Sequence, residues 1–452
     1  MVLGRLDGSA AARFRKDRGG NFAVIFGAIA SVLLLSAGFG LNTAQLMLTR
    51  SNLLNALDAA VTSTARDLTT GRIGERDARA TVEAFLLSNG GTGFAAPERI
   101  TLDSLLVDRA TSAVKAEASV VVELAFPMLG MGQTRRVATQ SAAVYSDRRI
   151  EISMMLDVTG SMAGQKLRDL KAAAKNAVGT LLAAQDASDP RVRIALVPYA
   201  NAVNAGGLAE ATVFVERRAE DRAEAPGMNA PRQAAAGRPD TCATERKGRH
   251  QYTDAGPQTA MVNRDLLLGD FATRMRSRAC PAAAVMPLTA DARKLSAAID
   301  GFVAEGGTGG HIGVQWAWYM LSDKWGGVMR ASERPAAADP RKVGKFAILM
   351  TDGEFNLSFF DARDAGEVYD GNGKQATRDA AAKLCRAMRD DGIEVFTIGF
   401  KLENRAAKQT MAECASPDIG NVRHYFETGT GAELEAAFLE VARNIERLAL
   451  TR

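Results

Sequence analysis

The sequence predicts an α/β domain with a doubly wound, mostly parallel sheet and a long insertion, preceded by one transmembrane helix and a small α+β stalk domain. Three observations support this prediction. Strand-like and helix-like stretches alternate from Ile150 to the C-terminus, as in sheets covered by helices on both faces. A long uncharged apolar run lies near the N-terminus. Between these regions, short stretches alternate apolar and polar residues with the period of a strand.

The composition is that of a globular protein. At about 150 residues per domain, 452 residues suggest two or three domains. The contents of 47% hydrophobic and 24% charged residues argue against wholesale disorder, collagen and coiled coil. A net charge of +4 and 6% aromatic residues give no sign of a nucleic-acid partner. Four cysteines without a CxxC pair and three histidines argue against a zinc site.

The N-terminal region predicts a membrane anchor. No charged residue occurs from 19 to 49, and the apolar run 22–41 spans about 30 Å as a helix, the thickness of a hydrocarbon core. A cleaved signal peptide is the alternative, but its apolar region is shorter and ends at a small-residue cleavage site. We therefore predict a retained helix at 19–49. Four basic residues precede it, so 1–18 is expected to be a cytoplasmic basic N-terminus: Arg13, Arg15, Lys16 and Arg18.

Residues 50–148 are predicted to form the stalk domain. Leucine, alanine and valine recur at helical spacing beyond the membrane run, so the helix is expected to continue to about residue 66. A second helix is expected within 72–95, before Gly90 and Gly91. Three or four strands are expected within 99–146.

The α/β domain is expected to occupy 149–452, with the insertion at about 202–284. Its strands are buried apolar runs, which we place at 151–158, 193–199, 346–350 and 394–400. Its helices show amphipathic spacing, and we place them at 166–182, 291–303, 312–321, 376–391 and 432–448.

Three loops next to these elements carry hydroxyl and carboxylate side chains. They are 157–161 (DVTGS), 306–310 (GGTGG) and 351–354 (TDGE). In a doubly wound sheet, ligands bind at the carboxyl ends of the strands, where such loops converge. Their donors form an all-oxygen set that suits a hard divalent cation, Mg²⁺ first and Mn²⁺ or Ca²⁺ as alternatives, and not zinc or copper. The predicted metal ligands are Asp157, Thr159, Ser161, Thr308 and Asp352.

Each loop alone has a simpler interpretation. Asp157 or Ser161 could cap the following helix, and TDG could be an ordinary turn. The glycine loop is similar to a phosphate-binding loop, but no Lys-Ser/Thr follows and the spacing differs from GxGxxG, so no nucleotide site is predicted. The three loops together, in order on an α/β pattern, favour the metal site.

At these residues the sequence resembles a von Willebrand factor A domain, whose metal-ion-dependent adhesion site has the pattern DxSxS…T…D. Thr159 replaces the usual serine and keeps its hydroxyl. The resemblance implies that Thr159 and Ser161 coordinate the metal directly. It implies that Asp157 and Asp352 act directly or through water, and that Thr308 joins depending on the conformational state. A partner protein would supply an acidic oxygen to the open coordination position.

The segment RFRKDRGGNFAVIFGAIASVLLL resembles the N-terminus of TadE/TadG-like Tad (Flp) pilus-assembly proteins. The TadG type adds a C-terminal A domain, and KLCRAMRDDGIEVFTIGF, ECASPD and the C-terminal helix fit that type. The resemblance implies a single-pass bacterial inner-membrane protein with a periplasmic bulk and pilus-assembly components as partners. Pilin-like members carry Glu at the fifth position after the cleavage glycine, where this chain has Ile25 after Gly20. A permanently anchored assembly protein is therefore expected, not a filament subunit.

An extracytoplasmic location permits disulfides. Sequence order suggests Cys242–Cys280 and Cys385–Cys414, although four cysteines allow three connectivities and free buried thiols are the alternative. His311 is expected to pack beside the helix start and not to bind the metal. The insertion is rich in basic residues, for which a solvated face is expected and a partner-binding surface is the alternative: Arg217, Arg218, Arg246, Lys247, Arg249, Arg274, Arg276 and Arg278.

The function expected from these features is partner binding through a divalent metal, without catalysis. No Ser-His-Asp order, activated cysteine or acid–base pair is visible in the sequence. Two other functions stay open. One is an envelope adhesion module unrelated to pili, and the other is a metal-dependent phosphohydrolase that uses Asp157 and Asp352.

Overall fold

The computed structural model describes most of the chain and forms two compact units. The first unit holds helices α2 and α3 and strands β1–β3, and the second holds everything from β4 onward. The predicted basic N-terminus 1–18, the pair Gly90-Gly91, and Arg274, Arg276 and Arg278 lie outside the described residues. The described residues are 19–69, 72–89, 100–108, 111–127, 132–145, 148–183, 185, 190–230, 241–268, 280–340, 342–364 and 367–451.

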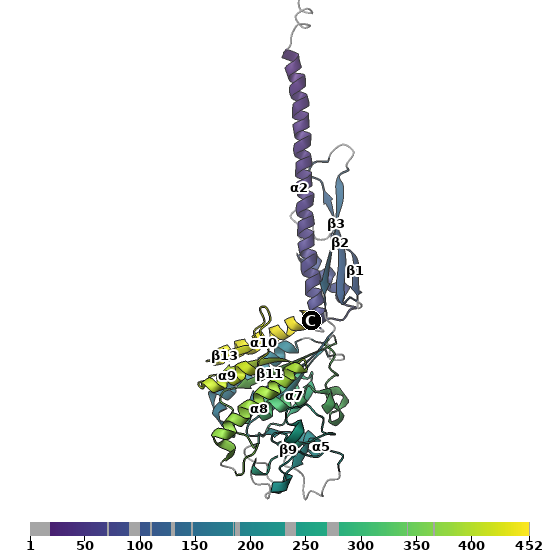
Figure 1. Cartoon of the computed structure of the whole chain (residues 1–452). Helices are drawn as coiled ribbons and strands as arrows, with labels where there is room; N and C mark the ends of the chain where they lie inside the picture. The colour runs from purple at the N-terminus through teal and green to yellow at the C-terminus, as the bar shows by residue number, and fades with distance from the viewer. Residues whose placement is uncertain are drawn as a thin grey trace, which may run out of the picture. The chain divides into compact units, whose positions relative to one another are not determined.

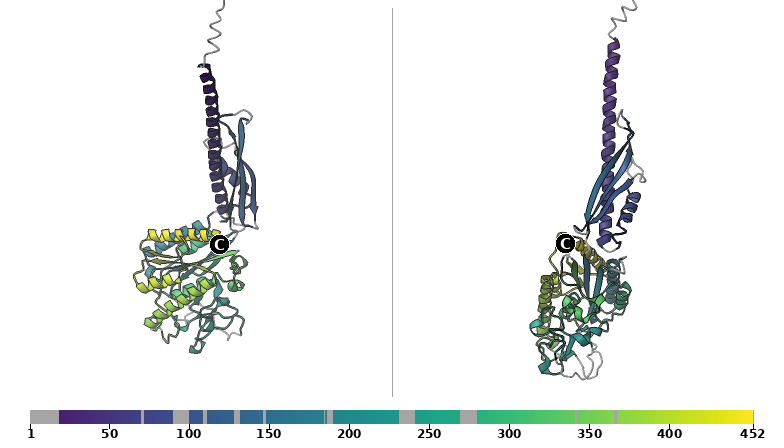
Figure 2. Two further views of the ribbon diagram at one scale, coloured as in Figure 1. Left: turned by 45° about the horizontal axis from the view of Figure 1, so that its top comes forward. Right: turned by 90° about the vertical axis from the view of Figure 1, so that its right-hand side faces the viewer.

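The first unit is a long helix beside a small antiparallel sheet. Strands β1, β2 and β3 pair in that order, and Figures 1 and 2 show the sheet alongside the C-terminal half of α2. The described part of 99–146 contains three strands, where three or four were expected. The elements are α2 (Gly19–Thr69), α3 (Ala78–Asn89), β1 (Ile100–Asp108), β2 (Ala113–Glu123) and β3 (Thr134–Val144).

Helix α2 changes character along its length. In its first half, large apolar side chains such as Val24, Leu34 and Phe39 are exposed. In its second half, apolar residues at helical spacing such as Leu53 and Leu57 are fully buried. The helix is unbroken across this change, so the expected continuation beyond the apolar run is confirmed.

The second unit is built on an eight-stranded mixed sheet. Its order is β13-β12-β11-β4-β5-β6-β8, with β10 antiparallel to β5. The five strands from β13 to β5 are parallel to their neighbours, while β6 and β8 continue the sheet antiparallel. The strands are β4 (Arg149–Asp157), β5 (Val192–Tyr199), β6 (Val203–Asn204), β8 (Cys242–Ala243), β10 (Met286–Thr289), β11 (Val343–Thr351), β12 (Glu394–Phe400) and β13 (Tyr425–Thr428).

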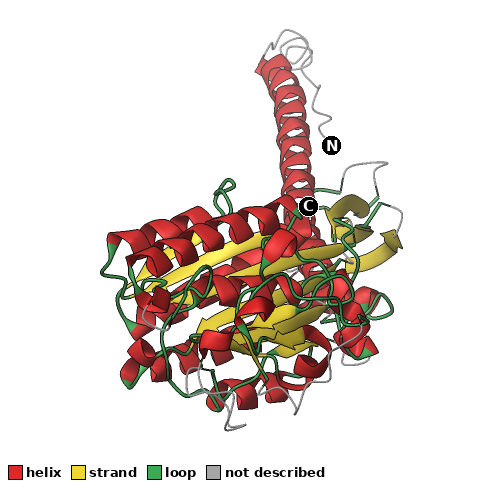
Figure 3. Cartoon of the chain, turned by 60° about the horizontal axis from the view of Figure 1, so that its bottom comes forward, coloured by secondary structure: helices red, strands yellow, loops and turns green. Residues whose placement is uncertain are grey.

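Helices cover both faces of this sheet (Figure 3). Alternate side chains of a strand point to opposite faces, so Ile152 and Met154 pack with α4, α6 and α10, whereas Met155 packs with α7, α8 and α9. A doubly wound, mostly parallel α/β fold is therefore confirmed. The helices are α4 (Gln165–Leu181), α6 (Ala292–Asp300), α7 (Gly310–Tyr319), α8 (Gly371–Asp390), α9 (Arg405–Cys414) and α10 (Gly431–Thr451).

The insertion after β5 is folded onto the α/β unit. Besides β6 and β8 it contains α5 (Ala209–Thr212) and the parallel pair β7 (Val213–Val215) and β9 (Val262–Arg264). Both expected disulfides are present, Cys242–Cys280 at the insertion and Cys385–Cys414 between α8 and the end of α9.

The expectation of a solvated basic face is wrong for Arg246 and Lys247, which are buried. The Arg246 guanidinium lies 4.9 Å from the ring centre of Tyr319 and 5.7 Å from that of Trp325, and it donates to the carbonyl of Ala260 at 2.8 Å. Aromatic faces and a carbonyl thus replace water around this charge.

Lys247 belongs to a buried group of charges that we call the insertion cluster: Glu216, Arg222, Lys247 and Asp265. The Lys247 ammonium donates to Glu216 at 2.6 Å and to Asp265. Arg222 donates to Asp265 at 3.1 Å. Two carboxylates therefore meet two cations, which explains why these charges are tolerated away from water.

Candidate metal centre

The first and third predicted loops meet at the centre of the sheet. Strand β4 ends at Asp157, and its parallel neighbour β11 ends at Thr351. From β4 the chain continues to β5 on one side and later returns to β11 on the other, so the two strand ends flank the point where the winding direction reverses. That point is the usual ligand position in such sheets.

Hydrogen bonds connect four of the five predicted ligands. The hydroxyls of Thr159 and Ser161 lie 2.9 Å apart, and the Ser161 hydroxyl donates to Asp352 Oδ1 at 2.6 Å. The Thr159 backbone N–H donates to Asp157 Oδ1 at 2.9 Å. Oxygen atoms from two loops nearly 200 residues apart in sequence are thereby brought into one group.

Thr308 lies on a loop that touches this group through its backbone. The Gly160 N–H donates to the Gly306 carbonyl at 2.9 Å, which sets the glycine loop against the first loop. The Thr308 N–H donates to Asn356 Oδ1 at 2.9 Å. Within the described part of the chain, no hydrogen bond links the Thr308 hydroxyl to the other four residues.

The glycine loop requires its glycines because other atoms approach closely. A Cβ on Gly310 would lie 2.1 Å from the ring of Phe355, and one on Gly309 would lie 2.8 Å from the Asn201 carbonyl. Asn201 also accepts from the Gly307 N–H and donates to the Tyr369 hydroxyl. These contacts fix the loop that carries Thr308.

Asp157 is the most enclosed member of the group. It is fully buried, and its Oδ2 accepts from the hydroxyls of Thr351 at 2.7 Å and Tyr199 at 3.0 Å. Burial and then the charge of Asp352 raise the pKa of Asp157 above its usual range. Thr351 and Tyr199 were not anticipated from the sequence, although both end strands that lead into the site.

Lys166 is a further unanticipated neighbour. It comes from the first turn of α4, and its ammonium lies 2.8 Å from Asp352 Oδ2. The Asp352 side chain has no exposed surface, whereas the Lys166 side chain is 28% exposed. Lys166 follows Ser161 by five residues and lies at the start of a predicted helix. This position is the sequence signal that could have identified Lys166 as a neighbour of the site.

The donor set fits a hard divalent cation. It offers two buried carboxylates and two connected hydroxyls, with the third loop's hydroxyl on an adjoining segment. Lys166 is the single cationic side chain that pairs with these carboxylates among the described residues. In that same part of the chain, no group of three or more His, Cys, Asp or Glu side chains comes together, so a nitrogen- or sulfur-rich site has no counterpart.

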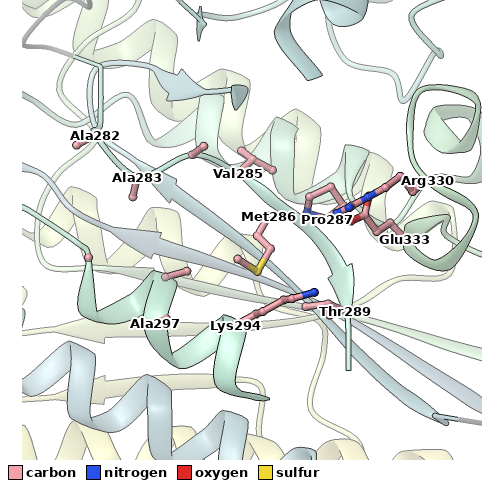
Figure 4. A pocket seen from close by; sticks show the side chains of 13 residues that line it. Ala282, Ala283, Val285, Met286, Pro287, Thr289, Lys294, Ala297, Arg330 and Glu333 are labelled. Atoms are coloured by element: carbon pink, nitrogen blue, oxygen red, sulfur yellow. Dashed lines mark hydrogen bonds and ion pairs between the residues drawn. The ribbon is translucent and has the colours of Figure 1, made fainter. Parts of the chain in front are cut away.

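His311 and a groove beside β10 lie apart from the five residues. His311 is buried, with Nδ1 2.6 Å from the Thr377 hydroxyl, so it packs as expected. A groove of about 510 Å³ opens between β10 and α6, where Figure 4 shows Met286, Lys294 and Arg330 around it. None of the five predicted ligands lines this groove.

Comparison with protein families finds one match, at the N-terminus. Residues 20–67 match the family model described as "Putative Flp pilus-assembly TadE/G-like". The matched segment lies within α2, which by length and composition can cross a membrane. The Tad resemblance of the N-terminal segment is therefore confirmed. No curated protein was found to match the chain.

Several solved structures show distant similarity. The von Willebrand factor domain of the type V pili tip protein Mfa5 from Porphyromonas gingivalis has 16% identity and a TM-score of 0.37, over 68% of this chain and 97% of that one. The pilus adhesin SpaC from Lactobacillus rhamnosus GG has 13% identity and a TM-score of 0.35, over 77% of this chain and 34% of that one.

A third structure, proximal thread matrix protein 1 from the mussel byssus, is described with a zinc-occupied adhesion-site motif. It has 13% identity and a TM-score of 0.32, over 66% of this chain and 46% of that one. At these scores the fold assignment rests on the sheet order and helix placement described above.

Proposed function

We propose, from the Tad match of residues 20–67, that this chain is a membrane-anchored Tad/Flp pilus-assembly protein whose second unit binds protein partners through a divalent cation. The second unit would then be a von Willebrand factor A-type domain that acts by adhesion and not by catalysis. The bulk of the chain would be periplasmic, behind an inner-membrane anchor with a cytoplasmic N-terminus.

The observation that supports metal binding is the hydrogen-bonded chain from Thr159 through Ser161 to Asp352. Hydroxyls and a carboxylate so arranged can turn their lone pairs to one cation. Asp157 would hold the first loop, since its oxygens already accept from Thr159, Thr351 and Tyr199.

A bound cation would supply the attraction for an acidic partner group. Hydroxyl ligands are neutral, so they do not neutralise the charge of a divalent metal. A carboxylate from a partner would complete the coordination of the metal. Thr308 would contribute from the glycine loop. Mg²⁺ is the expected ion, with Mn²⁺ or Ca²⁺ as alternatives.

Metal titration of a site variant tests this proposal. Asp352→Asn removes a carboxylate charge from the site, so the affinity for Mg²⁺ or Mn²⁺, measured by calorimetry on the full chain in detergent, should fall by about 100-fold or more. Capture of partner proteins from solubilised envelopes should fall in parallel, and EDTA should abolish capture by the unaltered protein.

Asp254→Asn is the matched control. Asp254 is also buried and is paired with a lysine, at 2.6 Å from Lys324, but it lies outside the site. This variant should keep the metal affinity. Equal metal affinity of Asp352→Asn and the unaltered protein would refute the metal site.

The two alternatives from the sequence give different results. An adhesion module unrelated to pili would keep metal-dependent binding, but its captured partners would not be pilus-assembly components. A phosphohydrolase would release phosphate from generic phosphoesters with Mg²⁺, an activity that Asp157→Asn and Asp352→Asn would remove.

A further inference from the structure

We propose that the exposed segment that follows strand β2, at Ala125, Phe126 and Pro127, is a second membrane contact that lies in the lipid headgroup region beside helix α2. The proposal rests on the membrane anchor in the proposed function. It adds a contact that neither the family match nor the transmembrane helix supplies.

Two side chains of α2 bind the backbone of this segment. The Asn42 amide donates to the Phe126 carbonyl at 2.7 Å and accepts from the Phe126 N–H at 3.0 Å. The Gln45 amide donates to the Glu123 carbonyl at 2.8 Å and accepts from the Ala125 N–H at 3.1 Å. Each amide thus satisfies one backbone donor and one acceptor, as a neighbouring strand would. The segment is therefore fixed at the level of residues 42–45 of the helix.

That level falls within the bilayer if the helix spans it. The uncharged part of α2, residues 19–49, is about 46 Å long at 1.5 Å per residue. A bilayer with its headgroup regions is about 40–45 Å thick, and its hydrocarbon core about 30 Å. With residues 22–41 in the core, the headgroup region on each side is about 5–7 Å deep, so residues 42–45 lie at headgroup depth.

The surface of the helix supports this depth. Met47 and Leu48 remain 69% and 48% exposed, and Arg50 is the first charged residue after the apolar run. On the other side of the helix a buried stripe begins at Gly38, inside the apolar run, and continues through Asn42, Gln45 and Thr49. Along α2, the face that packs on protein therefore begins at residues whose opposite face is still apolar and exposed.

The segment itself has the chemistry of an interfacial contact. Phe126 is 51% exposed, and Ala125 and Pro127 beside it are exposed as well. In the sequence, no charge occurs between Glu123 and Arg135. Burying an aromatic side chain away from water is favourable, and the headgroup region accepts an aromatic ring with polar backbone next to it.

Depth-resolved fluorescence quenching tests the proposal on the full chain. The four native cysteines are paired, so single variants with a new cysteine can be labelled with an environment-sensitive fluorophore. The protein would be reconstituted in vesicles of phosphatidylethanolamine and phosphatidylglycerol with lipids brominated at shallow or deep acyl positions. The variants are Phe126→Cys, Leu33→Cys within the apolar run, and Leu106→Cys.

Leu106→Cys is the matched control for an exposed apolar residue of the same sheet. Leu106 is 56% exposed and pairs with Lys115, which lies eight residues from Glu123 along β2. At 3.4 Å per residue this position is about 27 Å from the end of the strand, so its label should stay in water. We expect the label at 126 to be quenched most by shallow bromines and the label at 33 most by deep bromines.

The outcomes separate this inference from the anchor. Quenching at 33 without quenching at 126 would overturn the second contact and leave the anchor intact, and it would point to a protein as the occupant of this surface. Absence of quenching at 33 would refute the anchor itself. Asn42→Leu should reduce the shallow quenching at 126, whereas Thr43→Leu, the same change on the next residue of the helix, should not.

Discussion

Two buried groups of charges in the second unit differ in their balance. The insertion cluster pairs the carboxylates of Glu216 and Asp265 with two cations, Lys247 and Arg222. The candidate metal centre also contains two buried carboxylates, Asp157 and Asp352, but among the residues that the structure describes one ammonium, that of Lys166, pairs with them. The remaining partners in the centre are hydroxyls and backbone N–H groups.

The comparison shows that buried carboxylates can have a structural role in one place and a ligand-binding role in another. A balanced cluster satisfies its charges internally and holds the insertion together, with no need for an added ion. A cluster whose carboxylates outnumber its cations can attract an added cation. The three predictions below alter this balance, beginning with the largest expected effect.

Removal of the shared cation of the insertion cluster should have the largest effect. Lys247→Met leaves Glu216 and Asp265 with Arg222 alone, so the free energy of unfolding should fall by about 3–5 kcal/mol. Urea denaturation followed by circular dichroism measures the change. Lys408→Met is the control, because the side chains of Lys408 and Glu427 are 39% and 45% exposed, so their ion pair should be worth about 1 kcal/mol or less. Equal losses for the two variants would show that the cluster adds no special stability.

Removal of the ammonium from the metal centre should have an intermediate effect of the opposite sign. Lys166→Met frees Asp352 from its ion pair and removes a repelling charge, so affinity for Mg²⁺ should rise about tenfold, or about 1.4 kcal/mol. Calorimetric titration measures the affinity. Lys171→Met on the same helix is the control, since Lys171 contacts the Asp300 carbonyl instead. An unchanged or lower affinity for Lys166→Met would show that the lysine does not compete with the cation.

The pH dependence of the insertion cluster should be the smallest effect. Burial and then the charge of Asp265 raise the pKa of Glu216 above its usual value of 4.5. The folded state therefore holds this proton more tightly than the unfolded state, and the contribution of Glu216 to stability falls as pH rises from 4.5 through the raised pKa. Glu216→Gln should flatten the decline in unfolding free energy as pH rises above 4.5. Parallel curves for the variant and the unaltered protein would contradict the shift.

Much of the fold was predictable because its signals are local. The buried apolar runs gave the strands at 193–199 and 394–400 almost to the residue, and amphipathic spacing gave α4 and α8. Strands β10 and β13 were missed because four residues are too few to show a period. The burial of Arg246 was missed because its aromatic neighbours come from α7 and the segment after it.

The residues of the candidate centre that could be predicted are those that end strands or lie in tight loops. Asp157 and Asp352 could be placed together because adjacent parallel strands end at one edge. The roles of Tyr199 and Asn201 could not be foreseen, since they depend on which strand ends adjoin β4 and on the path of the glycine loop. Sequence spacing along one segment does not contain that information.

The unbroken course of α2 has a mechanical consequence. A helix of 51 residues is about 77 Å long, and it passes from its lipid-facing half into its sheet-packed half without a hinge. A sharp kink between the halves would require a break in the backbone hydrogen-bond ladder, so a tilt imposed on one half is largely transmitted to the other. The anchor and the stalk are thus mechanically coupled. A force applied to the small sheet would be transmitted to the part of the helix that lies in the bilayer.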